Sequence, residues 1–258
     1  MRTGMAWAAG AAALLLAGTA SAQDFQWHGR VAAGKTVEIK GVNGAIDATA
    51  ASGDEVEVTA TKRGRRSDPG SVRIEVVEHG EGVTICAVYP DVDGRRNECR
   101  AGDGGHMSTR DNDVNVHFTV RVPRGVAFAP RTVNGDVAAE GLEGDVSVRT
   151  VNGSVEVSTT GHADAQTVNG SIRASAGRAD WSGDAEFKTV NGSITVTLPS
   201  STSADVRAET VNGTIETDFP LTVSGRVSRR HLSGTIGGGG RALEMETVNG
   251  SIHLRKSS

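Results

Sequence analysis

Thr189-Val190-Asn191-Gly192-Ser193-Ile194 is the hexad that decides the fold, because the chain repeats it with small changes. Close copies run over residues 132–137, 150–155, 167–172, 189–194, 210–215 and 247–252, and an isolated early copy stands at 41–46. A degenerate copy, His231-Leu232-Ser233-Gly234-Thr235-Ile236, fills the gap before the last one. From Asn134 the equivalent position recurs after 18, 17, 22, 21, 21 and 16 residues. Self-similarity at this period predicts a repeat architecture whose units stack on their neighbours.

Each repeat predicts two strands joined by a corner. Asn-Gly is a strong turn signal because both residues tolerate positive φ. Apolar and polar residues alternate over 193–198, as on a strand with one buried face. Ala185 and Phe187 alternate in the same way before the turn, and that parity breaks at Val190. A unit is therefore strand, corner at Val-Asn-Gly, strand and loop.

Two all-β architectures fit this unit: a β-solenoid, with one coil per repeat, and an antiparallel meander or sandwich, with Asn-Gly at hairpin tips. The solenoid is favoured because stacked coils need the same residue at each corner, whereas hairpin tips do not. We expect the asparagines to form an amide ladder and the valines to fill one interior column. The expected turn residues are Asn43, Gly44, Asn134, Gly135, Asn152, Gly153, Asn169, Gly170, Asn191, Gly192, Asn212, Gly213, Asn249 and Gly250. The expected buried column is Val42, Val133, Val151, Val168, Val190, Val211, Leu232 and Val248.

Residues 1–22 have the pattern of a signal peptide. Arg2 gives a positive start, residues 5–17 form a short apolar core, and Ala20-Ser21-Ala22 is a cleavage site of the A-x-A type. No later stretch is long and apolar enough to predict a transmembrane segment in the mature chain. We therefore expect a soluble exported protein that is periplasmic, associated with the outer envelope, or extracellular.

The rest of the chain divides by regularity and not by a linker. Residues 23–124 alternate like strands but repeat poorly, and we expect them to begin the stack and to cap it, with Phe25 and Trp27 over the end. Residues 125–258 are expected to form the regular solenoid, continuous with the preceding region. Cys86 and Cys99, the only cysteines, are expected to form a disulfide because the chain is exported.

The sequence predicts no catalytic, cofactor-binding or metal-binding residues. The seven histidines have no ligand spacing, and the glycine run 237–240 lacks the lysine of a phosphate-binding loop. Residues 91–94 and 111–113 are acidic but depart from the spacing of a calcium loop, so solvated turns are favoured. Five copies match the N-x-S/T sequon, yet glycans cannot crowd onto asparagines about 4.8 Å apart. Basic clusters at 62–66, 95–96 and 229–230 are expected to be solvated loops.

The net charge of −4 lacks the basic surplus of a nucleic-acid-binding protein, so no nucleic acid is expected as a partner.

The hexads, the early copy Val42-Asn43-Gly44 and the stretch 114–126 resemble the bacterial "putative adhesin" family. This is a group of exported β-solenoid proteins catalogued as a domain of unknown function. The resemblance covers residues 35–254 and implies an envelope or surface β-solenoid without established catalysis. It supplies no catalytic or binding residues.

Three functions remain open at this stage. The favoured one is a non-enzymatic adhesin or interaction scaffold that binds an envelope or surface ligand (a glycan, a lipid or a protein) through the outward Ser, Thr, Glu and Arg faces. The second is a polysaccharide-acting lyase or hydrolase, for which Asp136, Asp145 and Glu156 are outward candidates. The third is a self-assembling structural protein.

Overall fold

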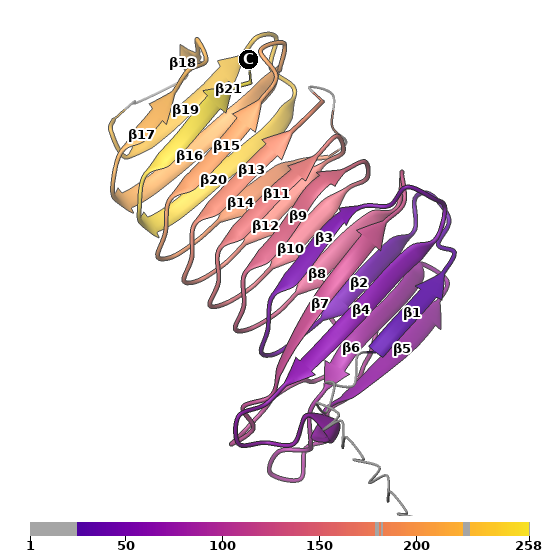
Figure 1. Cartoon of the computed structure of the whole chain (residues 1–258). Coiled ribbons are helices and arrows are strands. Elements are labelled where there is room, and N and C mark those ends of the chain that lie inside the picture. Colours follow the sequence, from indigo (N-terminus) through magenta and orange to yellow (C-terminus); the bar gives the residue numbers. More distant parts are fainter. Residues whose placement is uncertain (1–24, 179–180, 182, 224–227, 258) are drawn as a thin grey trace, which may run out of the picture.

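The protein is a β-solenoid of two long sheets packed face to face, described here from a computed structural model (Figure 1). The structure describes residues 25–178, 181, 183–223 and 228–257. The expected signal peptide, residues 1–22, lies outside the described residues. No helix among the described residues is long and apolar enough to cross a membrane.

Within the described residues, sheet A has ten strands and sheet B has eleven. In spatial order, sheet A contains β1 (Phe25–Gly29), β4 (Val56–Arg63), β7 (Asn115–Val122), β3 (Ile46–Ala50), β9 (Val137–Leu142), β11 (Val155–Thr159), β13 (Ile172–Ala176), β15 (Ile194–Leu198), β21 (Ile252–Lys256) and β17 (Ile215–Thr217). Sheet B contains β5 (Arg73–His79), β6 (Gly82–Val88), β2 (Thr36–Lys40), β8 (Ala127–Arg131), β10 (Val146–Arg149), β12 (Ala163–Gln166), β14 (Ala185–Lys188), β20 (Arg241–Asn249), β16 (Ala204–Asn212), β19 (His231–Ile236) and β18 (Thr222–Val223).

One rung of the stack is a strand of sheet B, a corner at the hexad, and a strand of sheet A. Successive rungs pair in parallel, as β10 with β12 and β11 with β13. Parallel bridges also join each corner asparagine to the next, from Asn43 to Asn134 and onward to Asn249. The Asn-Gly pairs are thus stacked at rung corners and are not hairpin tips, which confirms the solenoid over the meander.

The core lies between the sheets and follows the alternation seen in the sequence. Ile194, Val196 and Leu198 of β15 are at most 2% exposed. Ala185 and Phe187 of β14 point into the same interior from the opposite sheet. Narrow β-branched and aliphatic side chains fill the space between two sheets that approach to about 10 Å.

The N-terminal end is built from antiparallel strands. β1 pairs with β4, β4 with β7, and β5 with β6, so β1 and β5 are the edge strands of the two sheets. Phe25 and Trp27 are half-buried and pack against the core at this end. The first repeat, β2 with β3, stacks directly on β8 and β9 although about eighty residues of chain separate them.

The order of rungs at the C-terminal end differs from the order in the sequence. β20 and β21, the last strands of the chain, lie between β14 and β16 in sheet B and between β15 and β17 in sheet A (yellow between orange in Figure 1). The degenerate copy 231–236 was expected to form a rung of its own. Instead it is β19, which runs antiparallel to β16 on its outer side. Its Leu232 is buried there, but it belongs to no corner column.

The two cysteines are paired as expected. Cys86 of β6 is bonded to Cys99, with the Cα atoms 5.7 Å apart. The segment between β6 and β7 folds back over the outer face of sheet B, where the Lys40 ammonium donates to the carbonyls of Arg100 (2.5 Å) and Gly102 (2.6 Å).

Candidate functional site

The corner of each rung directs threonine inward. Thr150, Thr167, Thr189 and their equivalents are 4–6% exposed. Each threonine hydroxyl donates to the carbonyl of the corner glycine on the preceding rung, as Thr189 does to Gly170 at 2.9 Å. The same bond links Thr132 to Gly44, Thr150 to Gly135, Thr167 to Gly153, Thr247 to Gly192 and Thr210 to Gly250. A buried hydroxyl with a partner removes the cost of leaving a carbonyl unsatisfied.

The expected buried valine column is therefore wrong for most of its members. Val151, Val168, Val190 and Val248 are 38–39% exposed and Val211 is 56% exposed, while Val133 is half-buried. The strand parity that buries Ala185 and Phe187 continues to Thr189, so the next residue, Val190, must point outward. Val42 is buried, at the rung where the Tyr89 hydroxyl donates to the carbonyl of Asn43 at 3.3 Å.

Glycine is needed at the corner for a different reason from the one expected. Of the corner glycines, only Gly44 has a φ in the left-handed region, +135°. At Gly192 a Cβ atom would lie 2.0 Å from the carbonyl oxygen of Gly170, and the other corner glycines approach their neighbours equally closely. Glycine is thus required because successive rungs come too close for any side chain.

The corner asparagines form the amide ladder. Each Nδ2 donates to the Oδ1 of the next asparagine at 2.7–2.8 Å, in the order Asn212, Asn249, Asn191, Asn169, Asn152, Asn134 and Asn43. These amides are exposed, and the sequon asparagines use their amide groups for one another. The ladder explains the repeated asparagine without a glycan.

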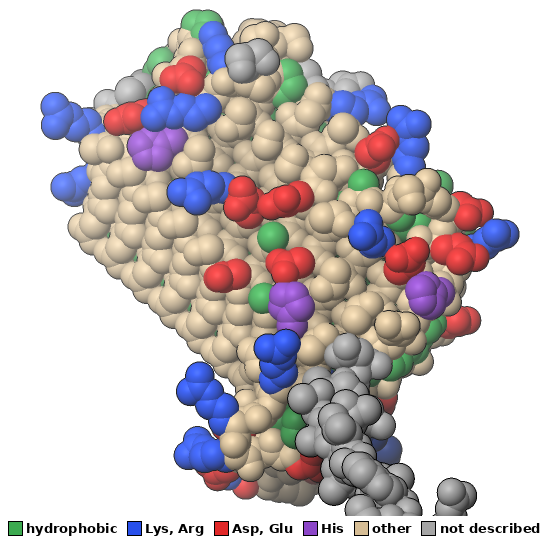
Figure 2. Space-filling model, in the orientation of Figure 1, with side chains coloured by type: hydrophobic (Ala, Val, Ile, Leu, Met, Phe, Trp, Pro, Cys, Tyr) green, Lys and Arg blue, Asp and Glu red, His purple; other side chains and the backbone are tan. Residues whose placement is uncertain are grey.

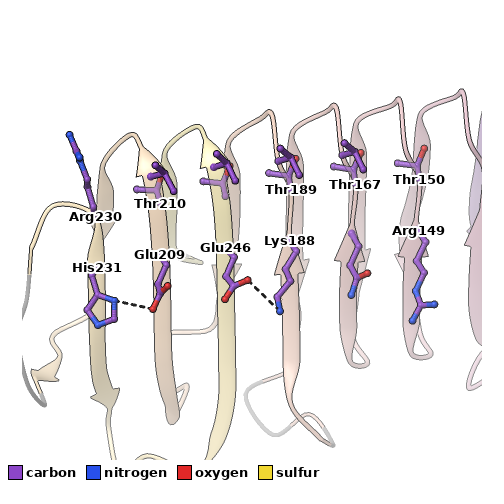
Figure 3. Close-up of a pocket in the computed structure, with 16 residues that line it drawn as sticks. Arg149, Thr150, Thr167, Lys188, Thr189, Glu209, Thr210, Arg230, His231 and Glu246 are labelled. Carbon is purple, nitrogen blue, oxygen red and sulfur yellow. Dashed lines mark ion pairs between the residues drawn. The ribbon is translucent and has the colours of Figure 1, made fainter.

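The outward valines form one edge of a groove that runs along the corner. We call the exposed valines Val151, Val168, Val190, Val248 and Val211 the valine ridge. Beside it lies a charged row of one side chain per rung on sheet B: Arg149, Gln166, Lys188, Glu246 and Glu209, followed by His231 (Figure 3). The groove has a volume of about 660 Å³.

Ion pairs within the charged row hold its side chains in place. Lys188 pairs with Glu186, with Glu244 at 3.5 Å and with Glu246 at 3.4 Å, and the hydrogen bond to Glu186 is the main reason that its pKa is raised. His231 Nδ1 lies 3.0 Å from Glu209 (Figure 3). The centre of the row, around Lys188, is therefore acidic overall, with three carboxylates around one ammonium.

The end of the charged row at Arg149 is basic. Asp103, which follows Cys99 in the segment between β6 and β7, lies 2.5 Å from Arg131 and 3.1 Å from Arg149. The hydrogen bond from Arg131 lowers the pKa of Asp103. Arg131 also pairs with the buried Glu38 at 3.3 Å. Lys40 is buried nearby, and this burial lowers its pKa. The cations at this end are Arg131, Arg149 and Lys40, and the carboxylates are Asp103 and Glu38. This end of the row therefore has an excess of positive charge.

A second candidate surface is the outer face of sheet A. A polar hollow of about 660 Å³ is lined there by Glu140, Glu156, Ser158, Arg173, Ser175, Thr195 and Thr197, among others. Among the described residues, the side chains of Glu140, Glu156 and Arg173 have no hydrogen-bond or ion-pair partner. They are free to contact another molecule.

Of the three carboxylates considered for chemistry, Asp136 and Asp145 have structural roles and Glu156 does not. Asp136 accepts a hydrogen bond from the amide of Ser154 at 2.7 Å, and Asp145 accepts one from His162 at 2.9 Å, so both tie one rung to the next. Glu156 lies in the hollow on sheet A. Of the acidic loop residues, Asp113 accepts from the amides of Arg66 and Ser67 and Asp93 pairs with Arg110. Among the described residues no group of three or more His, Cys, Asp or Glu is placed to hold a metal ion.

Sequence reasoning missed the groove because it placed the valines inside. The signal was present: Ala185, Phe187 and Thr189 share one parity, and that parity leaves Val190 outside. The charged row was also readable, since each of its members stands directly before the threonine of a hexad.

With this geometry in view, comparison with known proteins gives the family. A family model described as Toastrack DUF4097 matches residues 103–255, more than half of the chain. The chain belongs to the Toastrack family. This confirms the resemblance inferred from the hexads. The match begins after Cys99, in the segment between β6 and β7, and includes all of the stacked hexads from Asn134 onward. The valine ridge and the charged row therefore lie in the Toastrack domain.

A comparison with solved structures gives two matches of low identity and low TM-score. One is a crystal structure of a putative cell adhesion protein from Clostridium sporogenes ATCC 15579, with 10% identity, coverage of 91% of this chain and 100% of the other, and a TM-score of 0.45. Another is a putative adhesin from Bacteroides fragilis NCTC 9343, with 11% identity, coverage of 92% and 98%, and a TM-score of 0.35. No curated protein matches the chain in sequence.

Proposed function

We propose that this Toastrack protein is an exported, non-enzymatic interaction protein of the cell envelope that binds its partner through the outer face of sheet A. The observation that carries the proposal is the polar hollow whose Glu140, Glu156 and Arg173 side chains have no partner among the described residues. Glu156 and Arg173 are register partners on neighbouring rungs, Thr195 follows Arg173 on the next rung, and Ser158 and Ser175 lie beside them on the same strands.

The chemistry of this face favours a hydroxyl-rich polymer such as an envelope polysaccharide. Successive rungs, spaced about 4.8 Å apart, each present a hydroxyl, a carboxylate or a guanidinium group on this face. Such an array offers donors and acceptors along an extended ligand, and each contact is modest while their sum gives avidity. Lipid headgroups and proteins remain the other classes of envelope ligand to be tested.

The experiment is co-sedimentation of the purified exported protein with isolated envelope polysaccharide, lipid vesicles and envelope protein in separate tubes. We expect retention by the polysaccharide and at least a tenfold loss of affinity in Arg173→Ala and Glu156→Ala, an estimate of about 1.4 kcal/mol or more for each charged contact. Arg121→Ala is the matched control, because Arg121 lies on β7 outside the hollow and pairs with Glu57. Equal retention of all four proteins, or retention of none, would contradict the proposal.

A further inference from the structure

The exposed apolar surface of the described chain is concentrated in one place. The large apolar side chains that are exposed there are Val151, Val168, Val190, Val211, Val223 and Val248. All except Val223 belong to the valine ridge. On the face seen in Figure 2, by contrast, apolar side chains appear as isolated spots between polar and charged ones. A continuous apolar edge on an otherwise polar surface marks an interaction site.

The charges beside the ridge are ordered along the stack. Arg131 stands beside Arg149 on the next rung outside the groove. With it, the side chains read Arg131, Arg149, Gln166, Lys188, Glu246 and Glu209 from rung to rung. The basic end holds Arg131 and Arg149, which share Asp103. The acidic end holds Glu246, Glu244 and Glu209 against two cations, Lys188 and the Arg207 that pairs with Glu209 at 2.8 Å. Arg230 also lines the groove near Glu209, but its side chain projects away from the row (Figure 3).

We propose that the valine ridge is a self-association surface, on which a second copy of the chain docks antiparallel about a two-fold axis between the Gln166 and Lys188 rungs. This goes beyond the proposed function and uses a different face of the solenoid. The two-fold places Arg149 opposite the partner's Glu246 and Arg131 opposite the partner's Glu209. A parallel arrangement would instead place like charges together, which is unfavourable.

The rung spacing singles out a second copy as the occupant. Residues of the ridge repeat at about 4.8 Å, and only a partner with the same repeat keeps valine against valine over every rung. In the antiparallel register Val168 meets the partner's Val190, and Val151 meets the partner's Val248. The two ridges lie against each other and the two charged rows face each other beside them, so the apolar edge and the charged row are covered together.

The first test is the mass of the exported protein, measured by light scattering and sedimentation equilibrium over a wide concentration range. We expect twice the chain mass at high concentration. Val168→Glu sets two carboxylates near the axis and should weaken association about 100-fold or more. Thr119→Glu, which adds the same charge on an exposed position of β7 in sheet A outside the hollow, should still form the dimer. Melting curves establish that both variants are folded. A single-chain mass at every concentration, or equal association of both variants, overturns the proposal.

The second test fixes the orientation. Val151→Cys mixed with Val248→Cys should form an intermolecular disulfide under mild oxidation, because the two positions face each other across the axis. Val151→Cys alone should not, since its own copy in the partner lies about three rungs, or 14 Å, away. The native Cys86–Cys99 pair is already closed. Cross-linking of Val151→Cys alone, without the mixed product, would indicate a parallel dimer and overturn the antiparallel assignment.

Discussion

Each residue of the hexad has a separate physical role at the corner. Threonine points inward and donates to a glycine carbonyl, valine points outward, asparagine joins the ladder, and glycine allows the rungs to approach. The interior position therefore goes to the residue that can satisfy a backbone carbonyl, and the more hydrophobic valine is left at the surface. Burying an unsatisfied carbonyl would cost more than exposing one valine.

Exchanging the two neighbouring residues of one corner tests this assignment. Thr189→Val removes the buried bond to Gly170 and should lower the free energy of unfolding by about 1–2 kcal/mol. Val190→Thr makes the reverse change on the exposed side and should alter it by less than about 0.5 kcal/mol. Urea unfolding followed by circular dichroism measures both. If Val190→Thr lowered the free energy of unfolding more than Thr189→Val does, the result would contradict this assignment and favour a buried valine.

The hexad was sufficient to predict the solenoid, the asparagine ladder and the strand faces, because all of them follow from local periodicity. It was insufficient for Val190, since hydrophobicity and strand parity gave opposite answers there. Parity was the correct guide, because Thr189 Oγ1 has a carbonyl within 2.9 Å. The glycine requirement could not be read from one repeat, because the clash involves Gly170 of the neighbouring rung.

At the scale of elements, the long segment between β6 and β7 is held down by several local contacts. The Cys86–Cys99 bond and the Lys40 ammonium anchor its middle, and Asp113 anchors its end to the turn after β4. The Asp113 carboxylate accepts from the amides of Ser67 (2.9 Å) and Arg66 (3.1 Å). The backbone bond to Ser67 is the main reason that the pKa of Asp113 is lowered to about 2.

This lowered pKa gives the turn an acid dependence with a definite sign. In the unfolded chain an aspartate titrates near pH 3.9, so the stabilisation from Asp113 is complete above about pH 4. It is lost as the pH falls through about 2, where the folded carboxylate takes up its proton. The melting temperatures of wild type and Asp113→Asn should therefore differ above pH 4 and converge toward pH 2.

Asp111→Asn is the control for this measurement. Asp111 is an exposed neighbour with a φ of 52°, a conformation that asparagine also adopts readily. Its melting temperature should follow that of the wild type across the range. If Asp111→Asn reduced the change in melting temperature between pH 4 and pH 2 as much as Asp113→Asn does, the bonds to Ser67 and Arg66 would not be the cause of the acid dependence.

For the whole molecule, the stack does not follow the order of the sequence at its C-terminal end. β16, β17 and β19 follow β15 in the sequence but lie one rung position further along the stack. The position between, next to β14 and β15, is occupied by β20 and β21, the last strands of the chain. No sequence reading of the hexads could foresee this, because the repeats at 210–215 and 247–252 have the same corner and fit either neighbour. In the inserted rung, Leu243 and Met245 lie beside Ala185 and Phe187 on one side and beside Val206 and Ala208 on the other.

The inserted rung should control the stability of the strands outside it. β16 pairs with β20 from Ala204 to Asn212, and β17 pairs with β21 alone in sheet A. In a solenoid each rung depends mainly on its nearest neighbours. Ending the chain after Gly238 should therefore reduce amide-exchange protection of β16, β17 and β19 by about 100-fold or more, while β2 to β15 stay protected. Removing residues 257–258 is the control, because it costs the described bond from Ser257 to Leu198 and leaves the rung in place. If exchange rose uniformly from β2 to β19, the stack would unfold as one unit and the inserted rung would have no special role.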